Sequence, residues 1–290
     1  MISKETIKAA AKDAWIRSLC NIPEDVLEAL KEAERKETNP RGKRYFQILI
    51  DNAEKARKLG MVICQDTGVP TFFIRCPLNF PYTDEIRAPF DEAMHELTLG
   101  EFPTRPIVVH PLTRIDRGDN TAERVPILHM EFDNSLDHME IKAMPKGAGS
   151  GVWGTLSIMQ PGVGVDGVKK FVVDSVLRAG SYPCPPVIVG VGVGGTLEEV
   201  AALATEASAR PISQRHPEAD IAALEEELKE ALNLSQIGPM GMGGDTTVLA
   251  VNIEYAGTHR PWMPVAVNIN CWPGRTAISR VYPDGSWDKE

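Results

Sequence analysis

Apolar residues recur at helical spacing through the first sixty residues. Ile7, Ala11 and Trp15 fall on one face of a first helix, and Pro23 resets the chain for a second. A third helix is predicted from about residue 41 to 59, ending at Gly60, because glycine readily adopts the left-handed cap conformation. The pattern predicts a helical layer over residues 1–60 that covers a core or a partner.

From residue 61 the pattern becomes mostly that of β-strands. Val69–Ile74 is a β-prone run, and a helix is expected near residues 89–98. Val125–Phe132 and His138–Met144 are predicted to pair with each other across the polar turn Asp133–Asp137. The remainder alternates between helical and strand patterns. The prediction is an α+β fold in a single domain over 1–290, with a helical layer over 1–60 and a mixed α/β core over 61–290.

Two glycine-rich segments are candidates for ligand binding, one for an anion and one for a dinucleotide. Gly147–Gly151 allows close approach of backbone amides to an anion, although an ordinary tight turn is the alternative. The apolar run from Val187 to Val193 ends in Gly194 and Gly195, and a helix follows. Its glycines miss the Gly-x-Gly-x-x-Gly spacing, and no acidic residue ends a following strand. We therefore reject a dinucleotide site there.

Composition narrows the classes of partner. The 290 residues are 43% hydrophobic and 24% charged, with a formal net charge of -9. An acidic surface argues against nucleic acid or an anionic membrane as the main partner. There is no apolar run long enough to span a bilayer and no export signal at the N-terminus, so we expect a cytoplasmic protein.

Cysteine chemistry is the first candidate for function. The five cysteines are few and widely spaced, which is typical of reduced thiols rather than a disulfide framework. Cys64, Cys184 and Cys271 each lie at the edge of a β-prone run beside Gly or Pro. Three thiolates can hold a zinc ion, or three irons of a [4Fe–4S] cluster whose fourth iron stays open. Spacing does not choose between them, and buried structural thiols are the third reading.

Five segments occurring in order resemble the α subunit, or N-terminal half, of the iron–sulfur hydro-lyases, namely the class I fumarases and L(+)-tartrate dehydratases. The resemblance covers the chain from about residue 40 onwards. The segments are Cys64–Gly68, Lys146–Ser150, Cys184–Pro186, Gly192–Thr196 and Pro264–Cys271.

The resemblance implies a role for particular residues. Cys64, Cys184 and Cys271 match the ligands of a [4Fe–4S] cluster with one iron not ligated by protein. Asp66 and His259 match a catalytic pair in which the carboxylate orients the imidazole. The expected substrate-binding residues are Gln65, Arg105, Lys146, Gly147, Ala148 and Gly149.

The implied reaction is reversible dehydration of a 2-hydroxydicarboxylate, of the malate to fumarate type. L(+)-tartrate dehydratase and hydratase of a substituted diacid such as mesaconate are the alternatives within this class. Three departures from the fumarase pattern bear on the substrate: Gly151–Gly154 after the first glycine loop, Asp245 after Gly243-Gly244, and Trp272 after the last cysteine.

The family's site is completed by a β subunit or C-terminal half, so we expect this chain to work with a β subunit, as an α2β2 heteromer, on a small dicarboxylate. A zinc-dependent hydrolase is disfavoured because no His-rich or His/Glu ligand set is present. A non-catalytic assembly subunit is the remaining alternative, favoured only by the Gly151–Gly154 departure.

Overall fold

The chain forms two compact units, here named unit 1 and unit 2. The computed structural model describes residues 1–82, 85–102, 104, 105 and 107–289. Unit 1 consists of Met1–Ile22, Ala56–Gly147 and Arg275–Glu290, and unit 2 of Pro23–Lys55 and Ala148–Gly274. That the two units make up one domain, divided into 1–60 and 61–290, stays a prediction.

The N-terminal helices follow the predicted periodicity. They are α1 (Lys4–Cys20), α2 (Glu24–Lys36) and α3 (Pro40–Leu59), and Gly60 follows α3 with a φ of 62°. Ser3 caps the start of α1, and its side chain accepts a hydrogen bond from the Thr6 N–H. No helix among the described residues is long and apolar enough to cross a membrane.

Unit 1 is built on a five-stranded sheet in the order β11-β10-β5-β1-β4. Helices α1 and α4 (Ala88–Glu96) pack on it, and the rings of Trp15 of α1, Phe72 of β1 and Phe90 of α4 meet at tilted angles in its core. Burying each such ring contributes about 1.5–3 kcal/mol. The strands are β1 (Val69–Cys76), β4 (Ile127–Phe132), β5 (Met139–Lys146), β10 (Ala277–Val281) and β11 (Trp287–Lys289).

The predicted pairing of the strands at 125–132 and 138–144 is wrong. β1 lies between them, parallel to β4 and antiparallel to β5. Phe72 and Ile74 of β1 are fully buried, whereas β4 is largely exposed at the sheet edge. β1 has the central place between β4 and β5, where its side chains are covered on more sides than those of the edge strand β4. Helix-like η1 (Leu97–Glu101) and the short pair β2 (Val108–His110) and β3 (Ile115–Asp116) precede β4.

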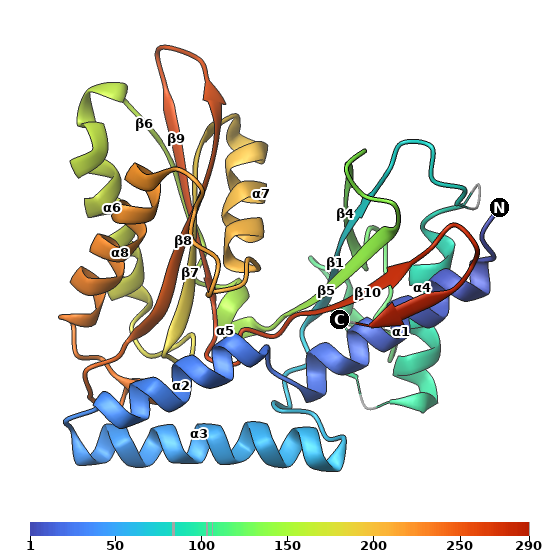
Figure 1. The fold of residues 1–290 in the computed structure, drawn as a ribbon, viewed down its shortest axis with the longest axis horizontal. Coiled ribbons are helices and arrows are strands. Elements are labelled where there is room, and N and C mark those ends of the chain that lie inside the picture. Colours follow the sequence, from blue (N-terminus) through green and yellow to red (C-terminus); the bar gives the residue numbers. More distant parts are fainter. Residues whose placement is uncertain (83–84, 103, 106, 290) are drawn as a thin grey trace. The chain divides into compact units, whose positions relative to one another are not determined.

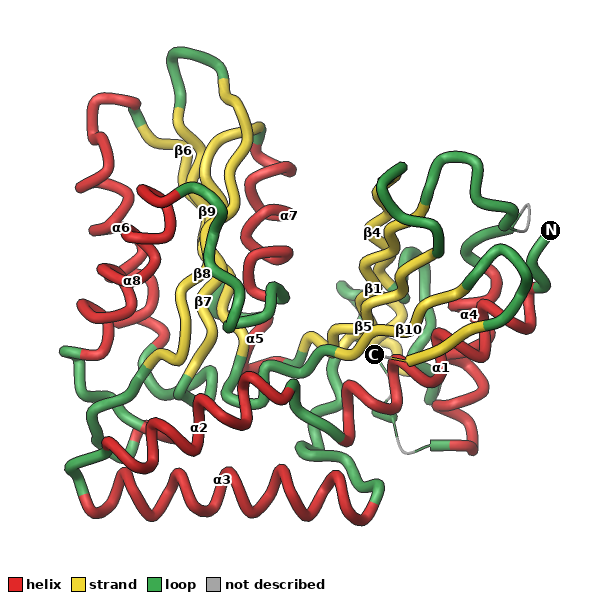
Figure 2. The backbone as a smooth tube through the Cα atoms, viewed as in Figure 1, coloured by secondary structure: helices red, strands yellow, loops and turns green. Residues whose placement is uncertain are grey.

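Unit 2 is built on a four-stranded sheet in the order β6-β9-β7-β8. Helices α6 and α8 cover one face and α7 the other (Figures 1 and 2). Its elements are α5 (Ala148–Gly151), β6 (Thr155–Met159), η2 (Pro161–Val163), α6 (Gly164–Ala179), β7 (Val187–Gly195), α7 (Leu197–Ser208), α8 (Ala219–Asn233), η3 (Pro239–Gly241), β8 (Val248–Thr258) and β9 (Met263–Asn270).

The glycines of β7 allow close packing of a helix. A Cβ added at Gly190 or Gly192 would lie 2.1 Å or 2.3 Å from a carbonyl oxygen of α7. Only glycine therefore permits this approach of α7 to the strand. The α+β class is confirmed.

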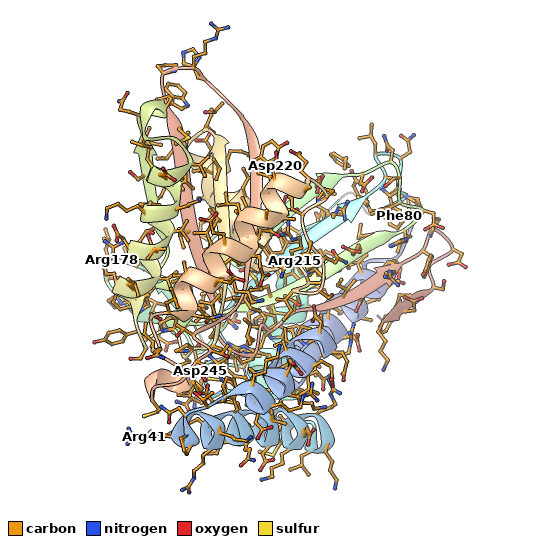
Figure 3. The ribbon with its side chains drawn as sticks, turned by 60° about the vertical axis from the view of Figure 1, so that its left-hand side comes forward. Arg41, Phe80, Arg178, Arg215, Asp220 and Asp245 are labelled. Carbon is orange, nitrogen blue, oxygen red and sulfur yellow. The ribbon has the colours of Figure 1, made fainter. Side chains whose placement is uncertain are left out.

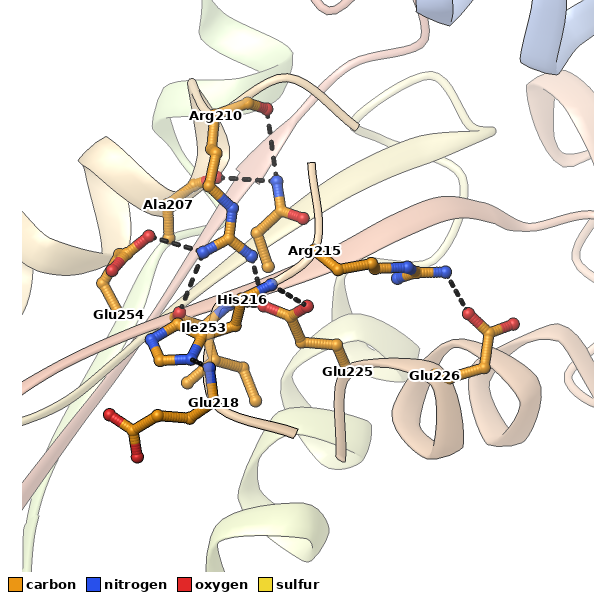
Figure 4. A network of polar contacts seen from close by, with 10 residues as sticks. Ala207, Arg210, Arg215, His216, Glu218, Glu225, Glu226, Ile253 and Glu254 are labelled. Carbon is orange, nitrogen blue, oxygen red and sulfur yellow. Dashed lines mark hydrogen bonds and ion pairs between the residues drawn. The ribbon is translucent and has the colours of Figure 1, made fainter. Parts of the chain in front are cut away.

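A buried ion pair fastens the segment before α8 to the sheet of unit 2 (Figure 4). Glu225 is fully buried and pairs with Arg210, which also binds Glu254 and the Ile253 carbonyl oxygen. The Glu225 carboxylate accepts the N–H groups of Ile253 and His216 as well. Because its acceptors are filled from inside unit 2, this cluster serves the fold.

Candidate functional site

The turn that carries Cys64 connects α3 to β1 in unit 1. The Asp66 N–H lies 3.4 Å from Cys64 Sγ, and the Gly68 N–H donates to Asp66 Oδ1 at 3.0 Å. Gly68 has a φ of 72°, and an added Cβ would lie 2.7–2.8 Å from backbone atoms of Lys146 and Gly147. The turn therefore closes directly onto the end of β5, and only glycine fits at position 68.

The Asp66 carboxylate packs against Gly147. A Cβ at Gly147 would lie 2.8 Å from Asp66 Oδ2 and 3.3 Å from Arg275 Nη2. The predicted site residues Asp66, Lys146 and Gly147 are thus brought together by backbone packing. The Asp66 side chain therefore lies so close to Gly147 that any larger residue at position 147 would displace it.

Arg275 holds this turn from inside unit 1, a role the sequence analysis missed. Its side chain is 2% exposed, and Nη1 donates to the Asp66 carbonyl oxygen at 2.8 Å. Its Nε is buried and has no hydrogen-bond partner among the described residues. A buried guanidinium is costly unless it is well satisfied, so its presence indicates a specific task. The available signal was an arginine four residues after Cys271.

Arg105 also lies beside this turn. Its N–H donates to Thr67 Oγ1 at 2.7 Å and its Nε to the Gln65 carbonyl oxygen at 3.3 Å. Thr67 is buried, whereas the Arg105 side chain is exposed. Gln65, Asp66, Arg105, Lys146 and Gly147 therefore form one neighbourhood, with two guanidinium groups around the Asp66 turn.

Cys184 and Cys271 are neighbours at one end of the unit 2 sheet. Cys184 precedes β7 and Cys271 follows β9, and Ile188 of β7 pairs with Asn270 of β9. The Trp272 N–H donates to the Cys184 carbonyl oxygen at 3.2 Å. Cys184 has a φ of 56°, in the left-handed region that non-glycine residues seldom adopt. Such a conformation persists only where surrounding structure fixes it.

The glycine-rich loop at residues 238–245 contacts the residue that follows Cys184. The Met240 N–H donates to the Pro185 carbonyl oxygen at 2.7 Å. The loop is anchored by Glu37, 6% exposed, whose two carboxylate oxygens accept the Asp245 N–H at 2.9 and 3.0 Å. Asp245 in turn accepts from the Thr38 N–H and hydroxyl, beside the start of α3 (Figure 3). These hydrogen bonds hold the pKa of Asp245 below its usual range.

The three departures from the fumarase pattern each place a side chain that is buried or in contact with another residue of unit 2. The Trp153 ring stacks on Tyr182, with centroids 4.9 Å apart. Trp272 is buried. The Asp245 carboxylate is engaged by Thr38. Each side chain therefore supports a segment near Cys184 or Cys271.

The cysteines fall into two kinds. Cys20 and Cys76 are buried, and burial raises the pKa of each thiol. Cys64, Cys184 and Cys271 are partly exposed and lie outside helices and strands. None of the five forms a disulfide, all of them within the described part of the chain. The described residues contain no ready-made group of three or more His, Cys, Asp or Glu ligands, so the three-thiolate set stays a prediction.

His259 lies in the turn between β8 and β9. It is exposed, and its ring meets the Trp262 ring edge-on at 4.9 Å. A cavity of about 510 Å³ beside it is lined by Gly195, Thr196, Glu199, Ala256, Gly257, Thr258, His259 and Trp262. The Ala148 and Gly149 positions lie in α5, at the sheet end that holds Cys271. Within unit 2, His259 is thus at the opposite end of the sheet from two of the predicted ligands.

A family model and two known proteins are similar to this chain. The fumarate hydratase (Fumerase) family model matches residues 8–280. A Methanocaldococcus jannaschii protein provisionally named L(+)-tartrate dehydratase subunit alpha is 42% identical over 266 residues, covering 91% of this chain and 93% of that protein. The L(+)-tartrate dehydratase subunit alpha of Escherichia coli K12 is 35% identical over 263 residues, covering 91% and 86%. The chain belongs to the fumarate hydratase family of hydro-lyases.

Proposed function

We propose that this chain is the α subunit of a [4Fe–4S]-dependent hydro-lyase. Its reaction is the reversible dehydration of a 2-hydroxydicarboxylate, with malate and fumarate as the first candidates. One observation carries the proposal: the turn starting at Cys64 sets the Asp66 carboxylate against Gly147, with Arg105 and Arg275 around it. Elimination of water from a diacid needs such a combination of proton acceptor and carboxylate-binding cation.

The thiols support the choice of cofactor. Cys64, Cys184 and Cys271 combine partial exposure with positions in loops, and Cys184 and Cys271 are linked through the Trp272 N–H. Three cysteine thiolates are the donors that three irons of a [4Fe–4S] cluster require. When bound, such a cluster supplies an open iron as a Lewis acid for the substrate hydroxyl. Thiols that must stay reduced favour a cytoplasmic setting.

The chain's own side chains have separate tasks. Arg105 uses Nε to hold the Gln65 carbonyl oxygen, which leaves its terminal N–H groups for a substrate carboxylate. Gln65 and the segment from Lys146 to Gly149 are assigned to substrate binding, as the resemblance to the family implies. Asp66 and His259 are assigned to proton transfer at the carbon next to the hydroxyl-bearing carbon.

A β subunit is proposed to complete the site, in an α2β2 heteromer. Support comes from the two relatives, each of which carries the name of a subunit alpha. The same names make L(+)-tartrate the second candidate substrate. The hypothesis of a zinc hydrolase has no comparable support.

The test is co-expression with the β subunit and anaerobic purification, followed by assays with malate, L(+)-tartrate and mesaconate. We expect one of these diacids to be dehydrated or hydrated, with loss of activity in air. A heteromer that contains zinc instead of iron, or turns over none of the three, would contradict the proposal. Inactivity with intact iron would favour the assembly-subunit alternative.

A further inference from the structure

The last residue of β9 is a buried asparagine that directly precedes a predicted cluster ligand. Asn270 is 2% exposed and is followed by Cys271. Its Nδ2 group is buried and has no hydrogen-bond partner among the described residues. A buried donor that stays unpaired costs about 1–3 kcal/mol, so an amide at this place needs a reason other than the stability of the fold.

The other two asparagines of the unit 2 sheet use their Nδ2 groups for packing. Asn268, on the same strand, donates to Thr205 Oγ1 of α7 at 2.7 Å. Asn252 of β8 donates to the Ala207 carbonyl oxygen of α7 at 3.0 Å. Both hydrogen bonds fasten α7 to the sheet. Asn270 lies on the same face, one row nearer to the cysteine end of the sheet.

The row of side chains that contains Asn270 is otherwise apolar. Asn270 pairs with Ile188 of β7, which pairs with Ala250 of β8, and partners in register lie on one face of a sheet. Ile188 and Ala250 are each 2% exposed. An apolar side chain in place of Asn270 would suit these neighbours better than an unpaired amide, because it has no polar group to desolvate.

The turn that carries Cys271 folds over this face of the sheet. A Cβ added at Gly274 would lie 2.7 Å from Cδ1 of Ile188, the side chain beside Asn270. The Gly274 N–H donates to the Cys271 carbonyl oxygen at 2.9 Å, which closes the turn. The Asn270 side chain and the cysteine turn therefore lie on the same side of the sheet, in one corner of unit 2.

We propose that the Asn270 amide donates a hydrogen bond to a sulfur of the iron–sulfur cluster held by Cys184 and Cys271. The inference rests on the proposed function, because it takes these two cysteines as cluster ligands. An unpaired buried donor beside the ligand turn fits such a cluster, whose thiolate and sulfide sulfurs are anionic acceptors. Hydrogen bonds to these sulfurs stabilise the more negative, reduced state. Asn270 therefore raises the reduction potential of the cluster and slows its loss in air.

The potential of the cluster tests this role. Asn270→Leu removes the amide and keeps a side chain of similar size. In the heteromer purified anaerobically with the β subunit, an EPR-monitored redox titration should show a midpoint potential shifted to more negative values. Bleaching of the visible absorbance in air should become about two- to tenfold faster, the factor that one hydrogen bond contributes.

Asn268→Leu is the matched control. It removes an amide from the same strand and the same face, but one that binds Thr205 of α7. The Asn268→Leu heteromer should keep the wild-type potential and bleaching rate. Equal shifts of the potential in the two variants would overturn the proposal, because they would show a general effect of loosening the strand.

Stability without the cluster separates the proposed role from a structural one. In heteromer stripped of metal, Asn270→Leu should leave the urea midpoint unchanged or raise it, because the amide has lost its acceptor. Asn268→Leu should lower the midpoint, since it removes the hydrogen bond to Thr205. An Asn270 amide that only binds a buried water would give the opposite result, a lower urea midpoint with an unchanged potential, and would overturn the proposal.

A second substitution keeps the test decisive if Asn270→Leu retains no iron. Asn270→Asp keeps the shape of the side chain and exchanges the donor for a carboxylate oxygen, so the potential should fall at least as far. A wild-type potential in Asn270→Asp would overturn the proposal. Iron-free wild-type heteromer is a different result, because it would overturn the proposed function itself.

Discussion

Arg275 donates a hydrogen bond from Nη1 to the carbonyl oxygen of Asp66, at 2.8 Å and inside unit 1. This contact joins the segment after the last predicted ligand cysteine to the turn that begins with the first. It stabilises the backbone of Asp66, whose carboxylate packs against Gly147. Arg275 is therefore a positioning residue for the proposed catalytic carboxylate.

Replacing Arg275 should destabilise the protein and reduce kcat. Arg275→Met takes the Arg275 donor away from the Asp66 carbonyl oxygen in a part-buried hydrogen bond, which costs about 1–3 kcal/mol in the free energy of unfolding. Urea denaturation measures this cost, and the assay should show a larger fall in kcat than change in KM. Arg178→Met is the matched control because Arg178 is exposed on α6, and it should change stability by at most about 0.5 kcal/mol. Equal effects of the two variants would refute the role given to Arg275.

Two glycines with similar backbone angles allow a comparison of strain and crowding. Gly60 and Gly68 have φ values of 62° and 72°, but only Gly68 faces atoms that an added Cβ would strike. Gly60→Ala should cost about 1–2 kcal/mol through backbone strain alone. Gly68→Ala should cost a further 1–3 kcal/mol or so through overpacking against β5. Thermal or urea unfolding checks the difference, and closely similar stabilities would show that the turn does not press on β5.

Alkylation rates should separate the two kinds of thiol in protein stripped of metal. Burial raises the pKa of Cys20 and Cys76, so near neutral pH these thiols stay protonated and unreactive. Their labelling should require a higher pH or unfolding. Cys64, Cys184 and Cys271 should react first because they are partly exposed. Mass spectrometry of iodoacetamide-treated protein reads each site, and preferential labelling of Cys20 or Cys76 in folded protein would be inconsistent with the structure.

Burial of Cys20 and Cys76 also predicts how the stability of the protein depends on pH. The pKa of each thiol is higher in the folded protein than in the unfolded chain. As pH rises, these thiols therefore ionise in the unfolded chain before they ionise in the folded protein. The stability gained from burying neutral thiols is fully present below about pH 8.5, the pKa of a free thiol, and declines above it.

Glu37 is predicted to act on the Cys184 segment through the loop at 238–245. Glu37→Ala removes the acceptor of the Asp245 N–H and leaves that donor unpaired, at a cost of about 1–3 kcal/mol. Because the loop holds the Pro185 carbonyl oxygen through Met240, retention of iron during gel filtration should fall as well. Glu28→Ala, which removes an exposed carboxylate from α2, the helix that Glu37 follows, should leave both properties unchanged. Unaltered iron retention in Glu37→Ala would show that the loop at 238–245 does not help to hold the cluster.

Much of the fold could be predicted from the sequence, because local pattern decides it. The periodicity of Ile7, Ala11 and Trp15 and the stop at Gly60 predicted the N-terminal helices correctly. The pairing of 125–132 with 138–144 was predicted wrongly, because β1, more than fifty residues earlier in the chain, takes the place between them. Strand order depends on which strand buries most surface, and local spacing does not contain that information.

The candidate site was predictable only in part. The resemblance pointed to Gln65, Asp66, Arg105 and Gly147, and the structure brings these residues together in unit 1. Arg275 was missed because a single arginine has no motif, and only its burial and its bond to Asp66 distinguish it. The separation of His259 from Cys271 by the length of a strand likewise has no signal in a spacing of twelve residues.

The central claim is that Cys64, Cys184 and Cys271 of this chain hold an iron–sulfur cluster, and iron and sulfide counting in matched cysteine variants tests it most directly. In the anaerobic heteromer we predict about four irons and four sulfides per α chain, with a broad visible absorbance that air bleaches. Cys64→Ser, Cys184→Ser and Cys271→Ser should each lose most of this iron together with the activity, whereas Cys20→Ala and Cys76→Ala should keep it. Iron-free wild-type protein, or iron that survives all three serine substitutions, would contradict the account.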